Sequence, residues 1–309
     1  MTPHKMAIVG IGKIARDQHI PALRSSPDFT LVACASRHAT VEGVDNFTSL
    51  EGLLVARPDV EAVAVCSPPQ VHYEAARLAL ESGKHVLLEK PPCATTVQLD
   101  ELAALAQRSG RTLFQTWHSQ HAAAVEPARR WLASRKVIEA RVTWKEDVRQ
   151  WHPGQTWIWQ AGGFGVFDPG INAVSILTRI IPEPIFATAA SLFIPSNREA
   201  PIAADVGFET DGGARIAAAF DFRHAGVQTW DIDVVTDDGA MSLRAGGSRL
   251  VIDGQGVQVD EGDGEYPSLY RRFADLLAKG ASEVDGRPFQ LVADAFLVGK
   301  RFQVEPFED

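Results

Sequence analysis

The 309-residue sequence contains little cysteine and no pattern typical of a metal site. Its three cysteines, Cys34, Cys66 and Cys93, are odd in number and lack metal-ligand spacing, which argues against a disulfide framework or a zinc cluster. The nine histidines form no HxH or HExxH motif, so we expect no metal. Cys34 and Cys66 lie in apolar runs, where a free thiol serves as a small core residue. We assign Cys93 no catalytic role.

Long basic blocks and long apolar segments are also missing. The net charge of −9 does not favour binding to a nucleic-acid backbone. No segment approaches the roughly 20 apolar residues that a membrane-spanning helix needs. The apolar stretch after Lys5 is too short for a signal peptide and leads directly into a glycine motif. We therefore expect a cytoplasmic protein whose partner is a small molecule rather than nucleic acid or a membrane.

The glycine motif is the segment GIGKIA at residues 10–15, directly after the apolar run 6–9. A strand before the turn and a helix after it are the context that a dinucleotide-binding fingerprint requires. Gly10 permits the turn, Gly12 lets the backbone approach a pyrophosphate, and Ala15 keeps the helix close to the sheet. A tight turn without a ligand is the alternative. With the free N–H groups of the helix start facing the phosphates, the predicted contacts are Gly10, Gly12, Lys13 and Ile14.

Apolar strands alternate with helical patterns over the first third of the chain. Short continuous apolar runs suit strands that are buried on both faces of a parallel sheet. Helical stretches at 72–82 and 96–109 are each followed by a glycine, the expected C-terminal stop. The pattern predicts a Rossmann domain, a doubly wound parallel sheet that binds NAD(P), over residues 1–120. Its strands after the first are predicted at 31–35, 63–66, 86–89 and 112–116.

The pattern changes after residue 120. Apolar and polar residues alternate from Ile138 to Lys145, which is the period of a half-exposed strand. Helices predicted at 266–279 and 291–302 close the chain. We predict that residues 121–309 form an α+β substrate-binding domain with a large, mainly antiparallel open sheet. Its further strands, several separated by Asp-Gly turns, are predicted at 185–194, 203–209, 214–222, 229–236, 240–243 and 249–252.

The residues after the second predicted strand bear on the choice of cofactor. A binder of unphosphorylated NAD usually has an acidic residue there for the ribose hydroxyls, whereas this chain has Ser36, Arg37 and His38. A guanidinium can pair with a 2′-phosphate, and a serine hydroxyl can hydrogen-bond to it. A solvated surface turn is the alternative. We predict NADP as the cofactor, with NAD also accepted.

The triplet Glu89-Lys90-Pro91 follows another predicted strand. The carboxyl ends of parallel strands are where ligands bind in such sheets. Pro91 fixes the backbone and would direct Lys90 out of the sheet edge. On these residues alone, a lysine at a strand end is usually solvated.

The glycine turn, the Glu-Lys-Pro triplet and the open second sheet together resemble the glucose–fructose oxidoreductase/inositol dehydrogenase (Gfo/Idh/MocA) family. The resemblance covers essentially the whole chain and implies that Lys90 lies beside the nicotinamide and the substrate hydroxyl. The segment SPPQVH at 67–72 resembles the family's loop near the nicotinamide ribose. The cofactor contacts that the resemblance adds are Ser67, Pro68, His72, Glu89, Lys90 and Trp117.

A second motif of this family, an Asp-x-Gly sequence followed by a histidine, is incomplete here. Asp168 and Gly170 match, but Asn172 occupies the expected histidine position. Asparagine cannot exchange a proton at neutral pH, so the usual lysine–histidine pair cannot operate in its common form. The resemblance then implies that Asp168 or Lys90 takes the proton while Asn172 orients the substrate. The predicted catalytic residues are therefore Lys90, Asp168 and Asn172.

Segments 117–119, 144–149, 151–155 and 165–172 resemble the L-arabinose 1-dehydrogenase/D-galactose 1-dehydrogenase subgroup. This resemblance implies oxidation of a pyranose C1 hydroxyl to an aldonolactone. Aromatic rings stack on pyranose C–H faces, and six of the seven tryptophans fall between residues 117 and 159, although Trp131 and Trp144 are expected in the core. The predicted substrate-binding residues are His118, Glu146, Trp151, His152, Asp168 and Asn172.

Two alternative functions remain open. One is another sugar or inositol dehydrogenase of the same family, and the other is a non-catalytic, NADP-sensing regulator. The sequence does not rank L-arabinose against D-galactose. The open sheet could also pair two copies of the chain into a homodimer.

Overall fold

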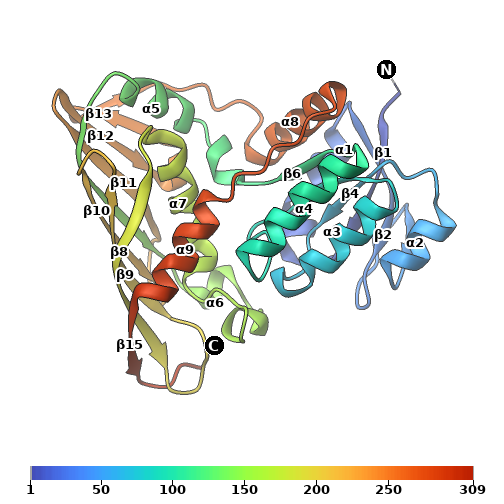
Figure 1. The fold of residues 1–309 in the computed structure, drawn as a ribbon, viewed down its shortest axis with the longest axis horizontal. Helices are drawn as coiled ribbons and strands as arrows, with labels where there is room; N and C mark the ends of the chain where they lie inside the picture. The colour runs from blue at the N-terminus through green and yellow to red at the C-terminus, as the bar shows by residue number, and fades with distance from the viewer. Residues whose placement is uncertain (1, 309) are drawn as a thin grey trace. The chain divides into compact units, whose positions relative to one another are not determined.

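The computed structural model describes residues 2–308, and the chain divides into two compact units (Figure 1). The first unit comprises Met1–Trp117 and Glu265–Gly286, and the second comprises His118–Gly264 and Arg287–Asp309. The segment Glu265–Gly286, which the sequence pattern assigned to the second domain, thus belongs with the first unit.

A six-stranded sheet forms the centre of the first unit, with the order β3-β2-β1-β4-β5-β6. All of its neighbouring strands pair in parallel, which confirms the predicted doubly wound sheet. The order reverses between β1 and β4, and ligands bind at such a switch point, beyond the carboxyl ends of the strands. The strands are β1 (His4–Val9), β2 (Phe29–Ala35), β3 (Asp45–Phe47), β4 (Ala62–Val65), β5 (His85–Leu88) and β6 (Leu113–Gln115).

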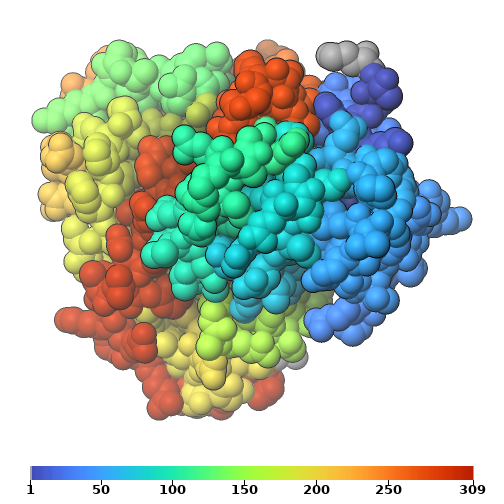
Figure 2. Space-filling view, turned by 45° about the vertical axis from the view of Figure 1, so that its right-hand side comes forward, coloured from blue at the N-terminus to red at the C-terminus, as the bar shows by residue number. Residues whose placement is uncertain are grey.

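Two helices of this unit match the sequence prediction closely, α3 (His72–Glu81) and α4 (Thr96–Ser109). Gly83 and Gly110 follow them with φ values of 73° and 62°, in the left-handed region that favours glycine. The two helices lie side by side at the surface (Figure 2). The other helical segments of the unit are η1 (Ala15–His19), α1 (Ile20–Ser25), α2 (Leu50–Ala56), η2 (Pro69–Val71) and α8 (Glu265–Lys279).

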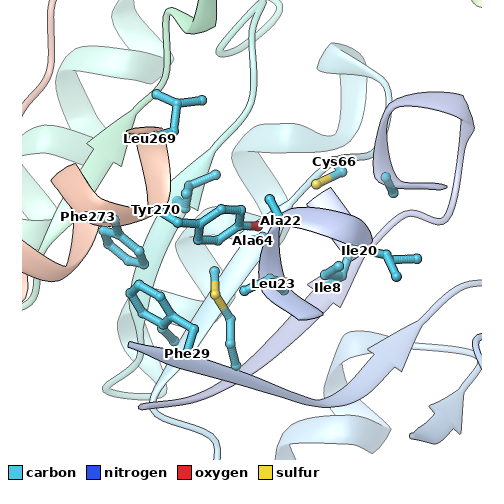
Figure 3. Close-up of a cluster of buried hydrophobic side chains, with 14 of the residues drawn as sticks. Ile8, Ile20, Ala22, Leu23, Phe29, Ala64, Cys66, Leu269, Tyr270 and Phe273 are labelled. Carbon is cyan, nitrogen blue, oxygen red and sulfur yellow. The ribbon is translucent and has the colours of Figure 1, made fainter. Parts of the chain in front are cut away.

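Helix α8 completes the core of the first unit with residues from late in the chain. Its Phe273 stacks on Phe29 of β2 with ring centroids 5.5 Å apart, and its Tyr270 is 1% exposed (Figure 3). Cys34 and Cys66 belong to the same apolar cluster, as the sequence predicts. Burial raises the pKa of both thiols, so they remain protonated core groups.

A nine-stranded mixed sheet forms the second unit, with the order β14-β13-β12-β11-β7-β10-β9-β8-β15. It is mainly antiparallel as predicted, but β10 pairs with β7, and β15 with β8, in parallel. The strands are β7 (Val137–Lys145), β8 (Ile185–Pro195), β9 (Ala203–Thr210), β10 (Arg215–Asp221), β11 (Thr229–Thr236), β12 (Gly239–Arg244), β13 (Arg249–Ile252), β14 (Gln255–Val257) and β15 (Gly299–Val304).

The end of the chain corrects one sequence prediction. The helix predicted to continue to residue 302 ends at Val298, and β15 begins at Gly299. Residues 299–304 pair along strand β8 and form the edge of the sheet, so tertiary pairing overrides the helical period of the apolar residues there. Strand β14, and strand β3 in the first unit, are further strands that the sequence pattern did not indicate.

Strand β7 follows the predicted alternation except at Ile138, which is 47% exposed. Its partner strand β11 pairs Val235 with Glu139 and Thr236 with Val137, so Ile138 has no partner across the ladder. A β-bulge of this kind inserts one residue and turns the side chains on either side of it out of phase.

Helices α5, α7 and α9 lie along one face of this sheet (Figure 1). Helix α7 carries Asp168 and Asn172, and it approaches strand β10 closely at Gly170. The helical segments of the unit are η3 (His118–His121), α5 (Val125–Leu132), α6 (Val148–Trp151), η4 (Thr156–Trp159), α7 (Phe167–Ile180), η5 (Ala245–Gly247) and α9 (Arg287–Val298).

The packing of α7 predicts an unfavourable effect for Gly170→Ala. A Cβ at this position would lie 2.9 Å from the ring of Phe220, which is buried and packs against Phe167 at 5.5 Å. Overpacking costs roughly 1–3 kcal/mol, whereas the gain in helix propensity is about 1 kcal/mol. We expect urea unfolding to show a net loss of up to about 2 kcal/mol. Gly256→Ala, at an exposed position with no neighbour within 4 Å, is the control. A Gly170→Ala protein more stable than the parent would contradict this packing argument.

Candidate functional site

The glycine turn after β1 has the geometry of a dinucleotide-binding turn. Gly10 has a φ of 87°, and a Cβ there would lie 2.6 Å from the backbone nitrogen of Ser67, so only glycine fits. Gly12 is exposed, and a Cβ there would meet nothing within 4 Å. Ala15 is fully buried, which allows the following helical segment to pack against the sheet. Lys13 forms a surface ion pair with Asp17.

A cavity of about 650 Å³ lies beside this turn, at the carboxyl ends of β1, β2 and β4. Gly10, Ser36, Arg37, His38 and Ser67 all line it, so the structure brings together five of the predicted cofactor residues. The Ser67 hydroxyl is buried and has no hydrogen-bond partner among the described residues. Such a buried polar atom, in a cavity that a dinucleotide can enter, fits a cofactor with phosphate and ribose groups.

Arg37 is exposed at the rim of this cavity. Within residues 2–308 its guanidinium forms no hydrogen bond or ion pair, whereas Arg77, which lines the same cavity, is paired with Glu81 at 2.9 Å. A guanidinium that is not engaged by the protein is available to an anionic group of a ligand. Of the two cavity arginines, Arg37 is thus the one whose guanidinium is not already paired with a carboxylate.

The carboxylate of Glu89 is engaged inside the first unit. It is 3% exposed and accepts hydrogen bonds from His19 Nε2 and the Tyr266 hydroxyl, each at 3.0 Å, and from the Lys90 backbone N–H at 2.7 Å. The Tyr270 hydroxyl lies 2.8 Å from the other His19 nitrogen. Burial raises the pKa of both tyrosines well above the ordinary value, so they stay neutral donors. These contacts fix the position of the Lys90 backbone through the buried Glu89 carboxylate.

His72 links the two loops that border the predicted nicotinamide end of the site. It is 1% exposed, with Nδ1 3.0 Å from the Pro91 carbonyl and Nε2 in contact with the Ser67 carbonyl. Burial lowers the pKa of His72, which favours the neutral ring. Burial also raises the pKa of Cys93 to about 12, so its thiol is unreactive.

The other residues predicted to contact the cofactor differ in how exposed their side chains are. The indole of Trp117 is 3% exposed and donates to the Asp285 carbonyl at 2.9 Å. Pro68 is exposed, and Lys90 is half-buried. The polar atoms of Glu89, His72 and Trp117 thus form hydrogen bonds within the protein. These residues can position the loops around the predicted cofactor site without contacting the cofactor through those atoms.

In the second unit, two predicted carboxylates lie on either side of one imidazole. His152 Nε2 lies 3.1 Å from Glu146 Oε1, and His152 Nδ1 lies 3.4 Å from Asp168 Oδ2. Both carboxylic residues are 3% exposed, and the His152 side chain is 13% exposed. We call these three residues the acid–imidazole cluster. Buried charges of this kind are costly unless paired, which makes such a cluster typical of a functional site.

Trp230 is a member of the site that the sequence analysis missed. Its indole N–H donates to Glu146 Oε2 at 2.8 Å, and its ring lies 5.0 Å from that of Trp151 and 6.0 Å from that of Trp144. Strand β11 places Trp230 directly opposite Trp144 of β7. The only local indication of this role in the sequence was a tryptophan at the start of an alternating run of residues. The sequence does not show that β11 pairs with β7, and this pairing is what brings Trp230 to the site.

Asn172 lies one helical turn after Asp168 on α7, so both side chains leave the same face of the helix. The Asn172 Oδ1 atom is buried without a hydrogen-bond partner among residues 2–308. His118 begins η3, and its Nδ1 lies 3.3 Å from the Ser119 hydroxyl. Trp144 is 4% exposed, in agreement with its predicted place in the core, whereas Trp131 is half-buried beneath Arg135.

The described part of the chain, residues 2–308, contains no group of three or more His, Cys, Asp or Glu residues arranged to hold a metal ion. Over the same residues, no helix has the length and apolar character needed to cross a bilayer.

Comparisons with known proteins identify relatives of this chain. The model of the GFO_IDH_MocA family, described as an oxidoreductase family with an NAD-binding Rossmann fold, matches residues 4–116. Galactose 1-dehydrogenase from Pseudomonas fluorescens is 45% identical over 309 residues, which is the full length of both chains.

Two solved structures extend the comparison. The D-galactose-1-dehydrogenase protein from Rhizobium etli is 54% identical, with a TM-score of 0.94 over 100% of this chain and 99% of its own. A 3-ketoreductase from Actinomadura kijaniata, crystallised with TDP-benzene and NADP, has a TM-score of 0.84 at 20% identity, covering 98% and 99%. The second likeness shows a shared fold only.

The two glycines of the turn predict separable effects. Gly10→Ala places a Cβ against the Ser67 backbone at an unfavourable φ, and we expect a loss of stability of about 1–3 kcal/mol. Gly12→Ala meets no protein atom, so we expect unchanged stability but weaker dinucleotide binding. Thermal unfolding and fluorescence titration with NADP and NAD measure the two effects. Normal dinucleotide affinity in Gly12→Ala would show that the backbone at residue 12 does not approach the phosphates.

Proposed function

Because the chain belongs to the Gfo/Idh/MocA family of oxidoreductases, we propose that it is an aldose 1-dehydrogenase. It oxidises the C1 hydroxyl of D-galactose, L-arabinose or both to the aldonolactone, with hydride transfer to NADP, and also accepts NAD. The observation that carries the proposal is the acid–imidazole cluster beside the rings of Trp151 and Trp230. Full-length similarity to two galactose 1-dehydrogenases supports the choice of sugar.

The second unit supplies the chemistry that a pyranose requires. Glu146 and Asp168 can accept hydrogen bonds from ring hydroxyls, and an indole face can stack on the C–H face of the sugar. Asn172, with its unpartnered buried oxygen, can orient a hydroxyl but cannot take its proton. D-Galactose and L-arabinose share the arrangement of their ring hydroxyls and differ by one exocyclic CH₂OH, so a site with space at that carbon takes both.

The first unit supplies the cofactor site. Gly10, Gly12, Lys13 and Ile14 present backbone N–H groups to the pyrophosphate, and Arg37 with Ser36 and His38 binds the 2′-phosphate. Ser67 and Pro68 border the nicotinamide ribose, and His72 and Glu89 hold the backbone around Lys90. The bound nicotinamide ring provides the hydride acceptor.

Asp168 is the group we assign to the proton of the C1 hydroxyl. It is buried, it belongs to the acid–imidazole cluster, and it lies on a helix whose packing fixes its position. General-base catalysis of this kind contributes about 10²–10⁴-fold to the rate. Lys90 is the other candidate, on the family resemblance.

The test of the proposed function is a purified-enzyme screen that follows NADPH absorbance with NADP and a panel of aldoses and inositols. We expect reduction of NADP with D-galactose and L-arabinose, little with D-glucose or inositol, and an aldonolactone as product. A ketose-like product would instead indicate oxidation at another carbon. NADP binding without turnover of any sugar would overturn the enzymatic assignment and favour a sensing role.

Arg37→Gln tests the choice of cofactor. Only NADP carries the 2′-phosphate, and a hydrogen bond to a charged group contributes about 1.5–3 kcal/mol. We therefore expect NADP to bind about 10–150-fold more weakly while NAD affinity changes little. Arg77→Gln, which removes a cavity arginine already paired with Glu81, is the matched control. Equal losses for the two dinucleotides in Arg37→Gln would mean that Arg37 does not contact the 2′-phosphate.

A further inference from the structure

We propose that His152 receives the proton from Asp168 and so takes the acid–base role for which this chain has no histidine at position 172. The inference rests on the proposed function, because Asp168 must first accept the proton of the sugar hydroxyl. It assigns His152 more than the sugar contact that the family resemblance implies. In this role His152 acts through Asp168 and is a positioning and proton-accepting residue.

The position of His152 is determined by contacts on each side of its ring. The residue directly follows α6, whose first turn is capped by Asp147. Glu146 lies just before this helix and binds Nε2, while Asp168 faces Nδ1 from the first turn of α7. The ring of Phe222 lies 5.3 Å from the imidazole. A histidine from a loop is thus held against two carboxylates from separate elements.

Proton counting indicates which ring nitrogen is free to accept. A neutral imidazole has one N–H, so it can donate to only one of the two carboxylates. Glu146 is the closer partner, at 3.1 Å, and the N–H belongs on Nε2. Nδ1 then carries a lone pair, yet it faces two acceptor oxygens, Asp168 Oδ2 and Gln155 Oε1, each at 3.4 Å. Protonation of Nδ1 converts both of these contacts from repulsive to attractive.

The charges of the cluster favour the same transfer. Among residues 2–308, Glu146 and Asp168 are the acidic groups that contact His152, one at each ring nitrogen. The indole N–H of Trp230 stabilises the Glu146 carboxylate at its other oxygen. The transfer leaves the net charge of the three groups unchanged, and it places a positively charged imidazolium between two carboxylates. These attractions are stronger in a buried site than they would be in water.

Three transfers carry the proton from the sugar hydroxyl to solvent. The O–H bond of the C1 hydroxyl breaks and an O–H bond forms on Asp168 as C1 loses its hydride to NADP. The Asp168 O–H then breaks and an N–H bond forms at His152 Nδ1, which restores the aspartate. The partly exposed imidazolium releases that proton to solvent, so one alcohol is oxidised, one NADP is reduced and one proton is released. The 3.4 Å separation suits a ligand-free site, since catalytic hydrogen bonds shorten when substrate binds.

A histidine that only binds the sugar makes different predictions from one that accepts the proton. Loss of a binding contact raises KM and leaves kcat nearly unchanged. Loss of a proton acceptor lowers kcat, and a small external base can replace it. The two roles therefore separate in the kinetic constants and in chemical rescue.

The experiment compares His152→Ala, His152→Gln and Asp168→Asn with the full-length parent, using D-galactose and NADP. We expect kcat to fall about 10²-fold or more in both His152 variants, with KM changed only a few-fold. Imidazole in the buffer should restore kcat in His152→Ala but not in Asp168→Asn. His224→Gln, a histidine of the same unit outside the cluster, should match the parent. NADP titration checks that each variant retains the cofactor site.

The protonation of His152 can also be measured by NMR in the absence of substrate. In the sugar-free protein labelled with ¹⁵N-histidine, we expect the His152 signal to report the Nε2–H form at neutral pH. Three outcomes would overturn the role of His152 while leaving the dehydrogenase assignment intact. They are an Nδ1–H form of His152, a rise in KM with unchanged kcat in the His152 variants, and a fall in kcat that imidazole does not restore. A parent protein that binds NADP but oxidises no aldose would overturn the proposed function, and the role of His152 with it.

Discussion

Strand β7 is the element on which the second unit depends, because it pairs with β11 on one side and with β10 on the other. These two ladders place Trp230 and Phe220 on either side of Trp144. Phe220 then supports the helix that carries Asp168, and Glu146 lies directly beyond the end of β7. The backbone hydrogen bonds of one strand thus bring together aromatic and acidic groups from four separate parts of the chain.

The first unit depends on a different constraint, the buried charge of Glu89. A carboxylate removed from water is costly unless donors surround it, and here the donors come from the segment after the glycine turn, from α8 and from the Lys90 backbone. The same contacts tie the segment after the glycine turn to the strand end that carries Lys90. Helix α8 is therefore part of the cofactor-binding unit in a structural sense, although it is encoded near the end of the sequence.

The departure from the family motif at Asn172 directs attention to the groups around Asp168 in space rather than in sequence. The motif position lacks an ionisable group, yet His152 lies 3.4 Å from Asp168. The sequence analysis did select Glu146, His152 and Asp168 as site residues, but it could not tell that one imidazole lies between the two carboxylates. Their arrangement arises from the packing of α7 against β7 and from the path of the chain out of β7 into α6, which local sequence patterns do not specify.

The sequence by itself determined the local elements: the glycine turn, the parallel strands, the two helices that end at Gly83 and Gly110, and the alternating strands of the second sheet. These features follow from backbone preferences and from the period of apolar residues, which act over a few residues. Only the tertiary structure decided that α8 joins the first unit, that residues 299–304 form an edge strand, and that Trp230 lies beside Glu146. Each of these depends on pairing or packing between distant segments, whose free energy is gained only when the whole fold is formed.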